Sequence, residues 1–447
     1  MNTALVGYYR CPDDFAEVTL KGQLSGDCGY FRFGQDAICY GQSTSGFRAT
    51  QPQGDLYDTF EDVTIDGSSV LLPFDPDDVI NNLRLERYAK QFSHNAFNLW
   101  KQSLKRAYYS LRPIMHLQLR RHIQRAHLNG WRNLLFPHWP VDTTVEDLCE
   151  QLLLLSMKAK GVDRTPFVWF WPDGAQSSVA MTHDLESRKG RDFCSELMDI
   201  DDSFGIKASI QVVPEGRYQV SDAFIQEIRL RRFEVNIQDL NHDGNLFRNR
   251  KEFLRRAQRI NEHAQRLGAS GFRAAVLYRN VDWYDALRFS FDMSVPNVAH
   301  LDPQRGGCCT VMPYFIGDIL EIPLTTTQDY MLFYLLNDYS LDLWKAQTEL
   351  IMKKNGLVSF IVHPDYLVDK KARGVYRDLL SFLRQLGQEK RIWFAVAGEI
   401  DHWWRARSQM RLVEYGGSWR IEGRGAERAK VAFAKIAGDR LEYEVDS

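Results

Sequence analysis

Short apolar runs alternate with amphipathic stretches over the second half of the chain, from about residue 165 to residue 407. The stretches between the runs, such as RNRKEFLRRAQRINEHAQRLG (248–268), repeat apolar residues at helical spacing. The strand-like runs are FVWFW (167–171), SVAMT (178–182), KASIQVV (207–213), FEVNI (233–237), FRAAVL (272–277), LEIPL (320–324), LVSFIV (357–362) and IWFAVA (392–397). Repeated strand–helix order with largely apolar strands predicts an α/β fold, a parallel sheet that closes into a distorted (β/α) barrel.

Different patterns flank this region. Residues 1–75 alternate short aromatic or β-branched runs with Gly, Ser and Asp, which predicts a small, mainly β module. Residues 76–164 have a helical pattern and form a predicted connector; its last helix begins near Asp142 or Thr143 and ends at Gly161. Residues 408–447 return to alternating strands with Gly turns, as expected of a small β appendage.

The composition narrows the class of protein. An apolar fraction of 44% in 447 residues supports a folded core, and a formal net charge of -2 argues against a nucleic-acid partner. The basic segment 102–132 is best read as a solvated helix face; a peripheral contact with membrane-linked glycan machinery is the sharper alternative. The seven cysteines form no metal or disulfide pattern, and no leader or apolar run of about 18 residues occurs, so we expect a cytoplasmic protein.

Polar side chains gather where the predicted strands end, which is where barrel enzymes place their chemistry. The run SVAMT continues directly into His183, Asp184, Leu185 and Glu186. Two acids at alternate positions of an extended segment point the same way, so Asp184 and Glu186 are predicted to face one site. The simpler interpretation is that Asp184 or Ser187 caps the following helix, but capping requires only one residue.

Three further polar groups follow the same rule. FEVNI leads into QDLNHDG, where Gln238 and His242 are spaced to approach one ion if the loop begins a helical turn. Arg273 begins the next strand and is either a surface residue or the partner of a buried carboxylate. LVSFIV ends at His363, whose exit direction is restricted by Pro364. Smaller signals of this kind are Asp292 in FDMS and the segment 325–329 after LEIPL.

The ordered motifs HDLE, QDLNHDG, GFR, EIP and HPDY resemble the polysaccharide deacetylase (NodB-homology) family over about residues 165–405. The resemblance implies that Asp184 is the catalytic base, that Arg273 contacts it and that His363 is the general acid. It also implies a divalent metal, Zn or else Co or Mn, bound by Glu186, His242 and the position of Gln238. The sequence departs from the family there, because Gln238 replaces a histidine and an amide oxygen is a weaker zinc ligand than imidazole.

The function implied by this resemblance is metal-assisted removal of N-acetyl groups from amino sugars of a glycan or glycan precursor. The expected substrate contacts are His183, Asp243, Asn280, Trp283 and Tyr366. Two alternatives stay open at this point, since fold alone does not decide function. One is another amide hydrolase, resembling allantoinases and acting without metal. The other is a catalytically silent domain that binds a glycan or an assembly partner.

Overall fold

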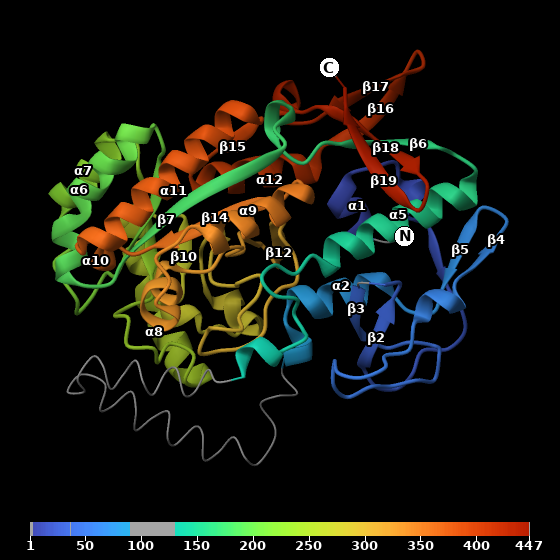
Figure 1. Cartoon of the computed structure of the whole chain (residues 1–447), viewed down its shortest axis with the longest axis horizontal. Coiled ribbons are helices and arrows are strands. Elements are labelled where there is room, and N and C mark those ends of the chain that lie inside the picture. Colours follow the sequence, from blue (N-terminus) through green and yellow to red (C-terminus); the bar gives the residue numbers. More distant parts are fainter. Residues whose placement is uncertain (1–2, 36, 90–129, 447) are drawn as a thin grey trace.

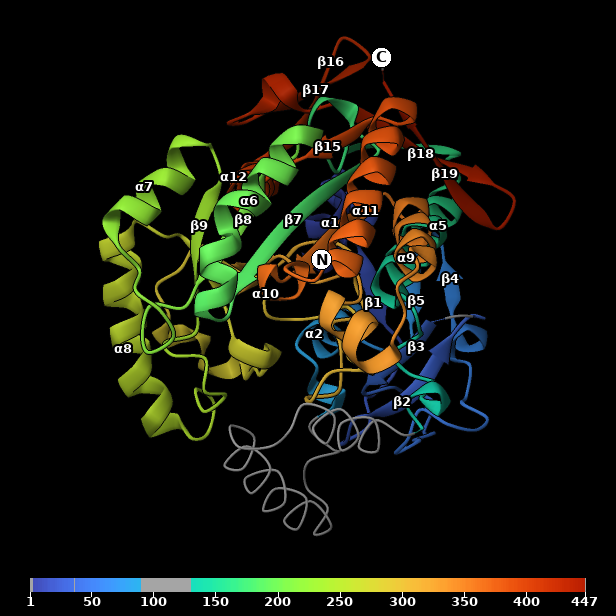
Figure 2. The ribbon, with the colours of Figure 1, turned by 60° about the vertical axis from the view of Figure 1, so that its left-hand side comes forward.

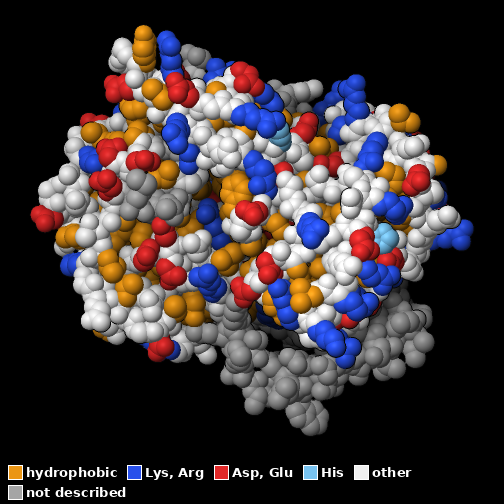
Figure 3. Space-filling model, turned by 180° about the vertical axis from the view of Figure 1, so that it is seen from behind, with side chains coloured by type: hydrophobic (Ala, Val, Ile, Leu, Met, Phe, Trp, Pro, Cys, Tyr) orange, Lys and Arg blue, Asp and Glu red, His pale blue; other side chains and the backbone are white. Residues whose placement is uncertain are grey.

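The computed structural model describes residues 3–35, 37–89 and 130–446. Figure 1 shows the barrel on one side of the molecule, with the N-terminal residues in blue and the C-terminal strands in red on the other. Most of the basic segment 102–132 lies outside the described residues. None of the described helices is long and apolar enough to cross a membrane. On the face seen in Figure 3, cationic and anionic side chains are interspersed around small apolar patches.

The barrel is built on one curled sheet. Its strands are β7 (Ser177–Leu185), β8 (Ala208–Val212), β9 (Glu234–Gln238), β10 (Gly271–Arg273), β11 (Phe291–Asp292), β12 (Tyr314–Ile316), β13 (Ile319–Glu321), β14 (Leu357–Val362) and β15 (Ile392–Phe394). The order is β12-β13-β11-β10-β9-β8-β7-β14, and β15 pairs with the first part of β7. Every pair is parallel except β12–β13. The predicted fold class, a distorted (β/α) barrel, is confirmed.

Amphipathic helices cover the outside of this sheet. They are α6 (Arg188–Phe204), α7 (Asp222–Leu230), α8 (Arg250–Leu267), α9 (Asp342–Lys353), α10 (Pro364–Leu367), α11 (Lys370–Glu389) and α12 (Ala397–Gln409). Figure 2 shows α6 and α11 lying along β7. Ser187 begins α6 by accepting a hydrogen bond from Lys189 N, and Gly205 ends it at φ 72°. Of the two candidate caps, Asp184 and Ser187, it is Ser187 that caps α6, which leaves Asp184 available for other contacts.

The alternation along β7 decides which side chains face the barrel interior. Val179 and Met181 pack with the apolar faces of the surrounding helices, so they point outward. Thr182 and Asp184 contact Arg273 across the barrel and therefore point inward. The strand buries all of its residues, and its last inward positions are polar.

The barrel closes through side chains between β14 and the segment after β13. Thr325 Oγ1 donates to the Leu357 carbonyl at 2.7 Å, and Thr326 Oγ1 donates to the Ser359 carbonyl at 2.7 Å. Ser359 N in turn donates to Thr325 Oγ1 at 2.9 Å. Hydroxyl groups thus satisfy backbone groups that a regular ladder would have paired. The barrel is therefore distorted at this point, because side-chain hydroxyl groups replace a backbone ladder between β14 and the segment after β13.

The flanking parts form separate small sheets. The elements that precede the barrel are the helices α1 (Thr3–Tyr9), α2 (Pro76–Arg84) and α5 (Thr144–Lys160) and the strands β1 (Val18–Leu20), β2 (Gly29–Phe33), β3 (Ala37–Gly41), β4 (Thr64–Asp66) and β5 (Ser69–Leu72). The strands that follow the barrel are β16 (Arg411–Tyr415), β17 (Ser418–Glu422), β18 (Val431–Ala437) and β19 (Arg440–Val445). The sheets are β1-β5-β4, β2-β3, β16-β17 and β19-β18-β6, in which β6 is Arg164–Val168.

Strand β6 (Arg164–Val168) corrects one element assignment. The run FVWFW was expected to begin the parallel sheet, but β6 pairs antiparallel with β18 of the C-terminal sheet. Phe167 packs against Tyr9 and Tyr443 there, at ring-centroid distances of 5.3 and 5.4 Å. A short apolar run fits any buried strand, so its composition does not identify its partner. The predicted domain boundaries stay a prediction.

The connector fixes the long loop that follows β11. Asn297 exchanges two hydrogen bonds with the backbone of Asp142, accepting from its N–H at 2.8 Å and donating to its carbonyl at 2.7 Å. Thr310 donates to the carboxylate of Glu146, and Tyr88 OH donates to the Gly307 carbonyl at 2.6 Å. These groups are buried, so each link is costly to leave unmade. The connector therefore holds one wall of the barrel mouth in place.

Candidate active site

The carboxylate of Asp184 lies at the end of β7, and both of its oxygens are hydrogen-bonded. Arg273 Nη1 donates to Oδ1 at 2.6 Å, and Gln238 Nε2 donates to Oδ2 at 3.1 Å. The guanidinium is itself held by Thr182 Oγ1 at 2.8 Å and by the Met293 carbonyl at 3.0 Å. Arg273 is thus the buried partner of a carboxylate and not a surface residue, which neutralises a charge that burial would otherwise make costly.

The imidazole of His363 lies at the end of β14 and is held by a fully buried carboxylate. Asp329 Oδ1 lies 2.6 Å from His363 Nδ1, and Asp329 Oδ2 accepts from the His363 backbone N–H at 2.7 Å. Burial on its own would lower the pKa of His363, but the charges of Asp329 and Glu186 outweigh it and raise that pKa well above its usual value. Because Asp329 occupies Nδ1, the other nitrogen, Nε2, is directed toward the barrel mouth.

Glu186 joins the two imidazoles. Its Oε1 lies 2.8 Å from His242 Nε2 and 3.5 Å from His363 Nε2. Burial raises the pKa of a carboxyl, yet the charges of His242 and His363 outweigh it and hold the pKa of Glu186 well below its usual value. Burial likewise opposes the charge on His242, but Glu186 raises the pKa of that imidazole.

These contacts bring the main predicted residues together. Asp184 and Glu186 are alternate residues of one extended segment, and Glu186 contacts both imidazoles. Gln238 bonds Asp184, and it lies four residues before His242 on the segment after β9. We call Asp184, Glu186, His242 and His363 the acid–imidazole cluster. Glu186 thus links the two imidazoles, and Gln238 links Asp184 to the segment that carries His242.

A second carboxylate fixes the backbone of this cluster. Asp365 Oδ2 accepts from Glu186 N at 3.2 Å, and Asp365 Oδ1 accepts from the hydroxyl of Ser187. Gly190 in the first turn of α6 makes room for it, because a Cβ at that position would lie 2.1 Å from Asp365 Oδ2. Sequence reasoning missed Asp365 and had Asp329 only within a range; the sole available signal was their place after predicted strands.

The donor atoms near Glu186 suit a divalent cation. Among the residues that the structure describes, no three His, Cys, Asp or Glu side chains are grouped as a cation site. Gln238 Oε1 is nevertheless buried with no hydrogen-bond partner, and His242 Nε2 makes no aligned hydrogen bond although it lies 2.8 Å from Glu186 Oε1. Gln238 Oε1 is thus an unpartnered acceptor, and a cation that replaced the proton between His242 and Glu186 would be held by Glu186, His242 and Gln238, one of whose donors is a neutral amide oxygen.

His183 is not at the site, which corrects its predicted role as a substrate contact. It alternates with Asp184 along β7 and so points to the outer face of the sheet. Its Nδ1 lies 3.0 Å from the Val362 carbonyl, and its Nε2 lies 2.9 Å from Asp201 Oδ2. Tyr376 OH donates to the other oxygen of Asp201 at 2.5 Å. The ring is fully buried with both nitrogens engaged, as in a structural network.

The other predicted substrate contacts separate into two groups. Tyr366 lies beside the cluster, with its ring centroid 5.1 Å from that of His363. Trp283 instead packs on α8, 5.5 Å from the ring of Phe253, so its predicted sugar contact is not supported. Asp243 Oδ1 and Oδ2 accept from Arg256 of α8 at 2.7 and 2.8 Å.

The Asp243–Arg256 contact has an electrostatic consequence. Burial opposes the charge on Asp243, but the hydrogen bonds from Arg256 lower its pKa to about 2. Asn280 lies half-buried at the start of the 3-10 helix Val281–Ala286, and within the described ranges its side chain makes no hydrogen bond to the cluster. Neither Asp243 nor Asn280 is therefore placed against the cluster by a contact.

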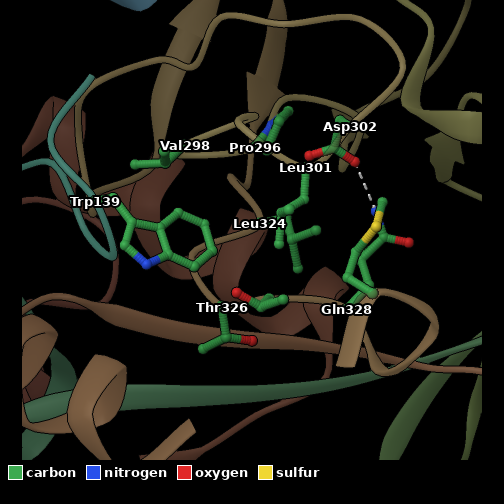
Figure 4. A pocket seen from close by; sticks show the side chains of 10 residues that line it. Trp139, Pro296, Val298, Leu301, Asp302, Leu324, Thr326 and Gln328 are labelled. Carbon is green, nitrogen blue, oxygen red and sulfur yellow. Dashed lines mark hydrogen bonds between the residues drawn. The ribbon is translucent and has the colours of Figure 1, made fainter. Parts of the chain in front are cut away.

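A small hollow lies between the loops after β11 and β13, and none of the four cluster residues lines it (Figure 4). Trp139 of the connector forms one side of it, and Leu324 and Thr326 line it from the segment after β13. Gln328 Nε2 donates to Asp302 Oδ1 at 3.0 Å on the opposite side. Burial raises the pKa of Asp302 to about 7, although Arg279 opposes the shift. Both the connector and the barrel thus line this hollow.

Comparison with known proteins finds likeness only at the level of structure. No family model matches the chain, and no curated protein matches it. A protein from Mycobacterium smegmatis described as a polysaccharide deacetylase shares 16% identity at a TM-score of 0.43, covering 56% of this chain and 96% of its own.

Two further solved structures match at similar values. One, from Pseudomonas aeruginosa, is described as a polysaccharide deacetylase and shares 11% identity, covering 53% of this chain and 93% of its own at a TM-score of 0.41. The other, an allantoinase, has the same identity and TM-score and covers 53% of this chain and 92% of its own. At these values the likeness supports no conclusion about this chain, and the chemistry must be argued from the side chains.

Proposed function

We propose that the acid–imidazole cluster hydrolyses an amide, the N-acetyl group of an amino sugar in a glycan or glycan precursor. One observation carries the proposal: an ion-paired carboxylate, Asp184, and an imidazole held by Asp329, His363, lie at the carboxyl ends of the paired strands β7 and β14. Amide hydrolysis needs a base for the attacking water and an acid for the departing amine. The substrate class is taken from the motif resemblance, and Tyr366 beside His363 offers an aromatic face for a sugar ring.

The residues of this chain divide the proton transfers between them. Asp184 accepts a proton from water as the oxygen attacks the acyl carbon, while Arg273 and Gln238 keep the carboxylate oriented. His363 Nε2 donates a proton to the amine nitrogen as the carbon–nitrogen bond breaks, which releases acetate and the free amine. Asp329 holds the opposite nitrogen of the ring and so keeps Nε2 as the donor.

A cation bound by Glu186, His242 and Gln238 would supply polarisation of the acyl carbonyl and a lower pKa for the attacking water. The contribution of the chain is to hold the three donors together. Glu186 is fixed through Asp365, and Gln238 is fixed through Asp184. Chelator treatment is therefore expected to remove activity, and Zn, Co or Mn to restore it.

Asp184→Asn tests the base. The amide cannot accept a proton, so acetate release from N-acetylated amino-sugar oligomers is expected to fall by about 10² to 10⁴-fold. The variant removes the counter-charge of the buried Arg273, so a loss of about 3–5 kcal/mol in stability is expected as well, and circular dichroism must verify that the protein is folded at the assay temperature. Asp243→Asn is the matched control, since Asp243 pairs with α8 and should leave acetate release nearly unchanged. Equal activity in both variants would contradict the assignment.

Metal-free hydrolysis of another amide is the second candidate. It is favoured by the direct approach of His242 Nε2 to Glu186 Oε1, a contact that balances charge without a cation. The chelator experiment separates the two, because activity on an amide that is insensitive to chelator would favour this candidate. A wild-type protein that binds glycan without releasing acetate would instead indicate the silent domain.

A further inference from the structure

Only one end of the Gln238 side-chain amide, its NH2 group, makes a hydrogen bond to a described residue. Its side chain is 1% exposed, and Nε2 donates to Asp184 Oδ2 at 3.1 Å. The carboxylate only accepts, so the amide must turn its NH2 group toward Asp184 and its carbonyl oxygen away from it. That oxygen, Oε1, has no hydrogen-bond partner among the described residues. A buried, unpaired amide oxygen is costly, so Oε1 is an acceptor that a bound ligand would satisfy.

The neighbouring donors indicate what kind of ligand this is. His242 Nε2 is buried without an aligned hydrogen bond, and the Glu186 carboxylate lies 2.8 Å from it. An amide oxygen, an imidazole nitrogen and a carboxylate oxygen together suit a divalent cation. Arg217 lies 3.5 Å from His242 Nδ1 and donates to the His242 carbonyl at 2.5 Å. This guanidinium adds positive charge near the site and weakens the hold on any cation.

We propose that Gln238 bridges the base and the cation, and that it shifts the preference of the site away from zinc and toward manganese. The inference rests on the cation site of the proposed function. Carboxylate and carbonyl oxygens suit Mn²⁺, whereas imidazole favours Zn²⁺. An amide in place of a third nitrogen or thiolate donor therefore costs Zn²⁺ more affinity than it costs Mn²⁺. The same amide links the cation to Asp184, because an ion on Oε1 polarises the NH2 group and strengthens its hydrogen bond.

Titration calorimetry of the metal-free, full-length protein with MnCl2 and with ZnCl2 tests the preference. Gln238→His should strengthen Zn²⁺ binding by about 10 to 100-fold and change Mn²⁺ binding much less. Gln238→Leu removes the oxygen and should weaken binding of both ions by at least about 10-fold. Electron paramagnetic resonance of Mn²⁺ gives an independent measure of the bound fraction.

Gln211 offers a matched control on the neighbouring strand β8. It is also a buried glutamine with an unpartnered Oε1, but its amide donates to the Ser209 carbonyl and the Met293 sulfur. Gln211→Leu should therefore leave both affinities near wild type. Circular dichroism verifies that each variant is folded, and Gln238→Met, which also removes the amide oxygen but keeps the length of the side chain, replaces Gln238→Leu if that variant unfolds.

The outcomes separate this inference from the proposed activity. Three results would overturn the bridging role. The first is an equal change in Zn²⁺ and Mn²⁺ affinity on Gln238→His, and the second is an equal loss of affinity in Gln211→Leu and Gln238→Leu. The third is that the wild type binds neither ion at millimolar concentration. If acetate is released under those conditions, the hydrolase proposal survives alone. If Mn²⁺ binds through Gln238 but no amide is cleaved, the bridge stands and the hydrolase proposal fails.

Discussion

At the level of single residues, Asp329 positions the imidazole of His363, the proposed general acid. Its two oxygens contact the ring nitrogen and the backbone N–H of the same residue, His363. This double contact fixes both the rotation of the ring and the nitrogen that faces the barrel mouth. A carboxylate that contacted only the ring would leave the backbone free to shift. Asp329 is accordingly a positioning residue in the proposed reaction.

Asp329→Asn is expected to reduce kcat by about 10²-fold with a much smaller change in KM. The amide still accepts from the backbone N–H, but it no longer stabilises the charged imidazole. Steady-state kinetics on N-acetylated oligomers would measure the split, and Asp338→Asn, beyond the π-helix Met331–Leu336, provides a control outside the cluster. A rise in KM with kcat unchanged would assign Asp329 to substrate binding instead.

The cluster could be predicted in part because strand ends can be read from sequence. Asp184, Glu186 and His363 follow apolar runs, and the structure joins them through Glu186. The role of His183 was mistaken because a strand reverses its side chains at each residue, and the sequence did not indicate which of the neighbours points inward. Asp329 lies eight residues beyond β13, in a segment whose path no periodicity describes.

At the level of elements, the helices were more predictable than the sheet partners. The pattern GRDFCSELMDIDDSFG corresponds to α6, with its polar cap and terminal glycine, because these signals are local. Strand β6 had an equally clear apolar run, yet it joined another sheet, because strand pairing depends on residues far away in sequence. The closure between Thr325 and Ser359 was not predictable for the same reason.

Gly190→Ala tests the support that α6 gives to the cluster. The added methyl group would meet Asp365, so we expect a loss of about 1–3 kcal/mol in stability and reduced acetate release. Gly374→Ala in α11 is the matched control, because nothing lies within 4 Å of its added Cβ. That helix should gain about 0.5–1 kcal/mol. Denaturant unfolding of both variants measures the difference; a stable, fully active Gly190→Ala variant would exclude this support.

At the level of the whole molecule, buried polar links join the connector to the barrel. Glu146 of α5 is fully buried and accepts from the hydroxyl of Thr310 in the loop after β11. Burial raises the pKa of Glu146 to about 8, against the opposing effect of Thr310. The link between the two parts therefore contains a carboxyl group that keeps its proton near neutral pH.

This carboxyl makes stability depend on pH in a defined direction. The unfolded pKa is about 4.3, so between that value and about 8 the folded state binds a proton that the unfolded state has lost. Its contribution is complete below the unfolded pKa and declines as pH rises through the folded pKa. Glu146→Gln should flatten the fall in unfolding free energy between pH 5 and 8. Denaturant titrations across this range, with exposed Glu17→Gln as control, would refute the assignment if both slopes equal the wild-type slope.

The pairing of β6 with β18 has a consequence for synthesis on the ribosome. Residues 164–168 emerge long before residues 431–435, which supply their partner strand. Arg407 is a second late partner of these early residues, since its guanidinium donates to the carbonyls of Val168 at 2.7 Å and Tyr8 at 2.8 Å. The nascent chain must keep an aromatic strand unpaired while the entire barrel is translated. Shielding of that exposed edge by a chaperone during elongation is therefore expected to govern the yield of native protein.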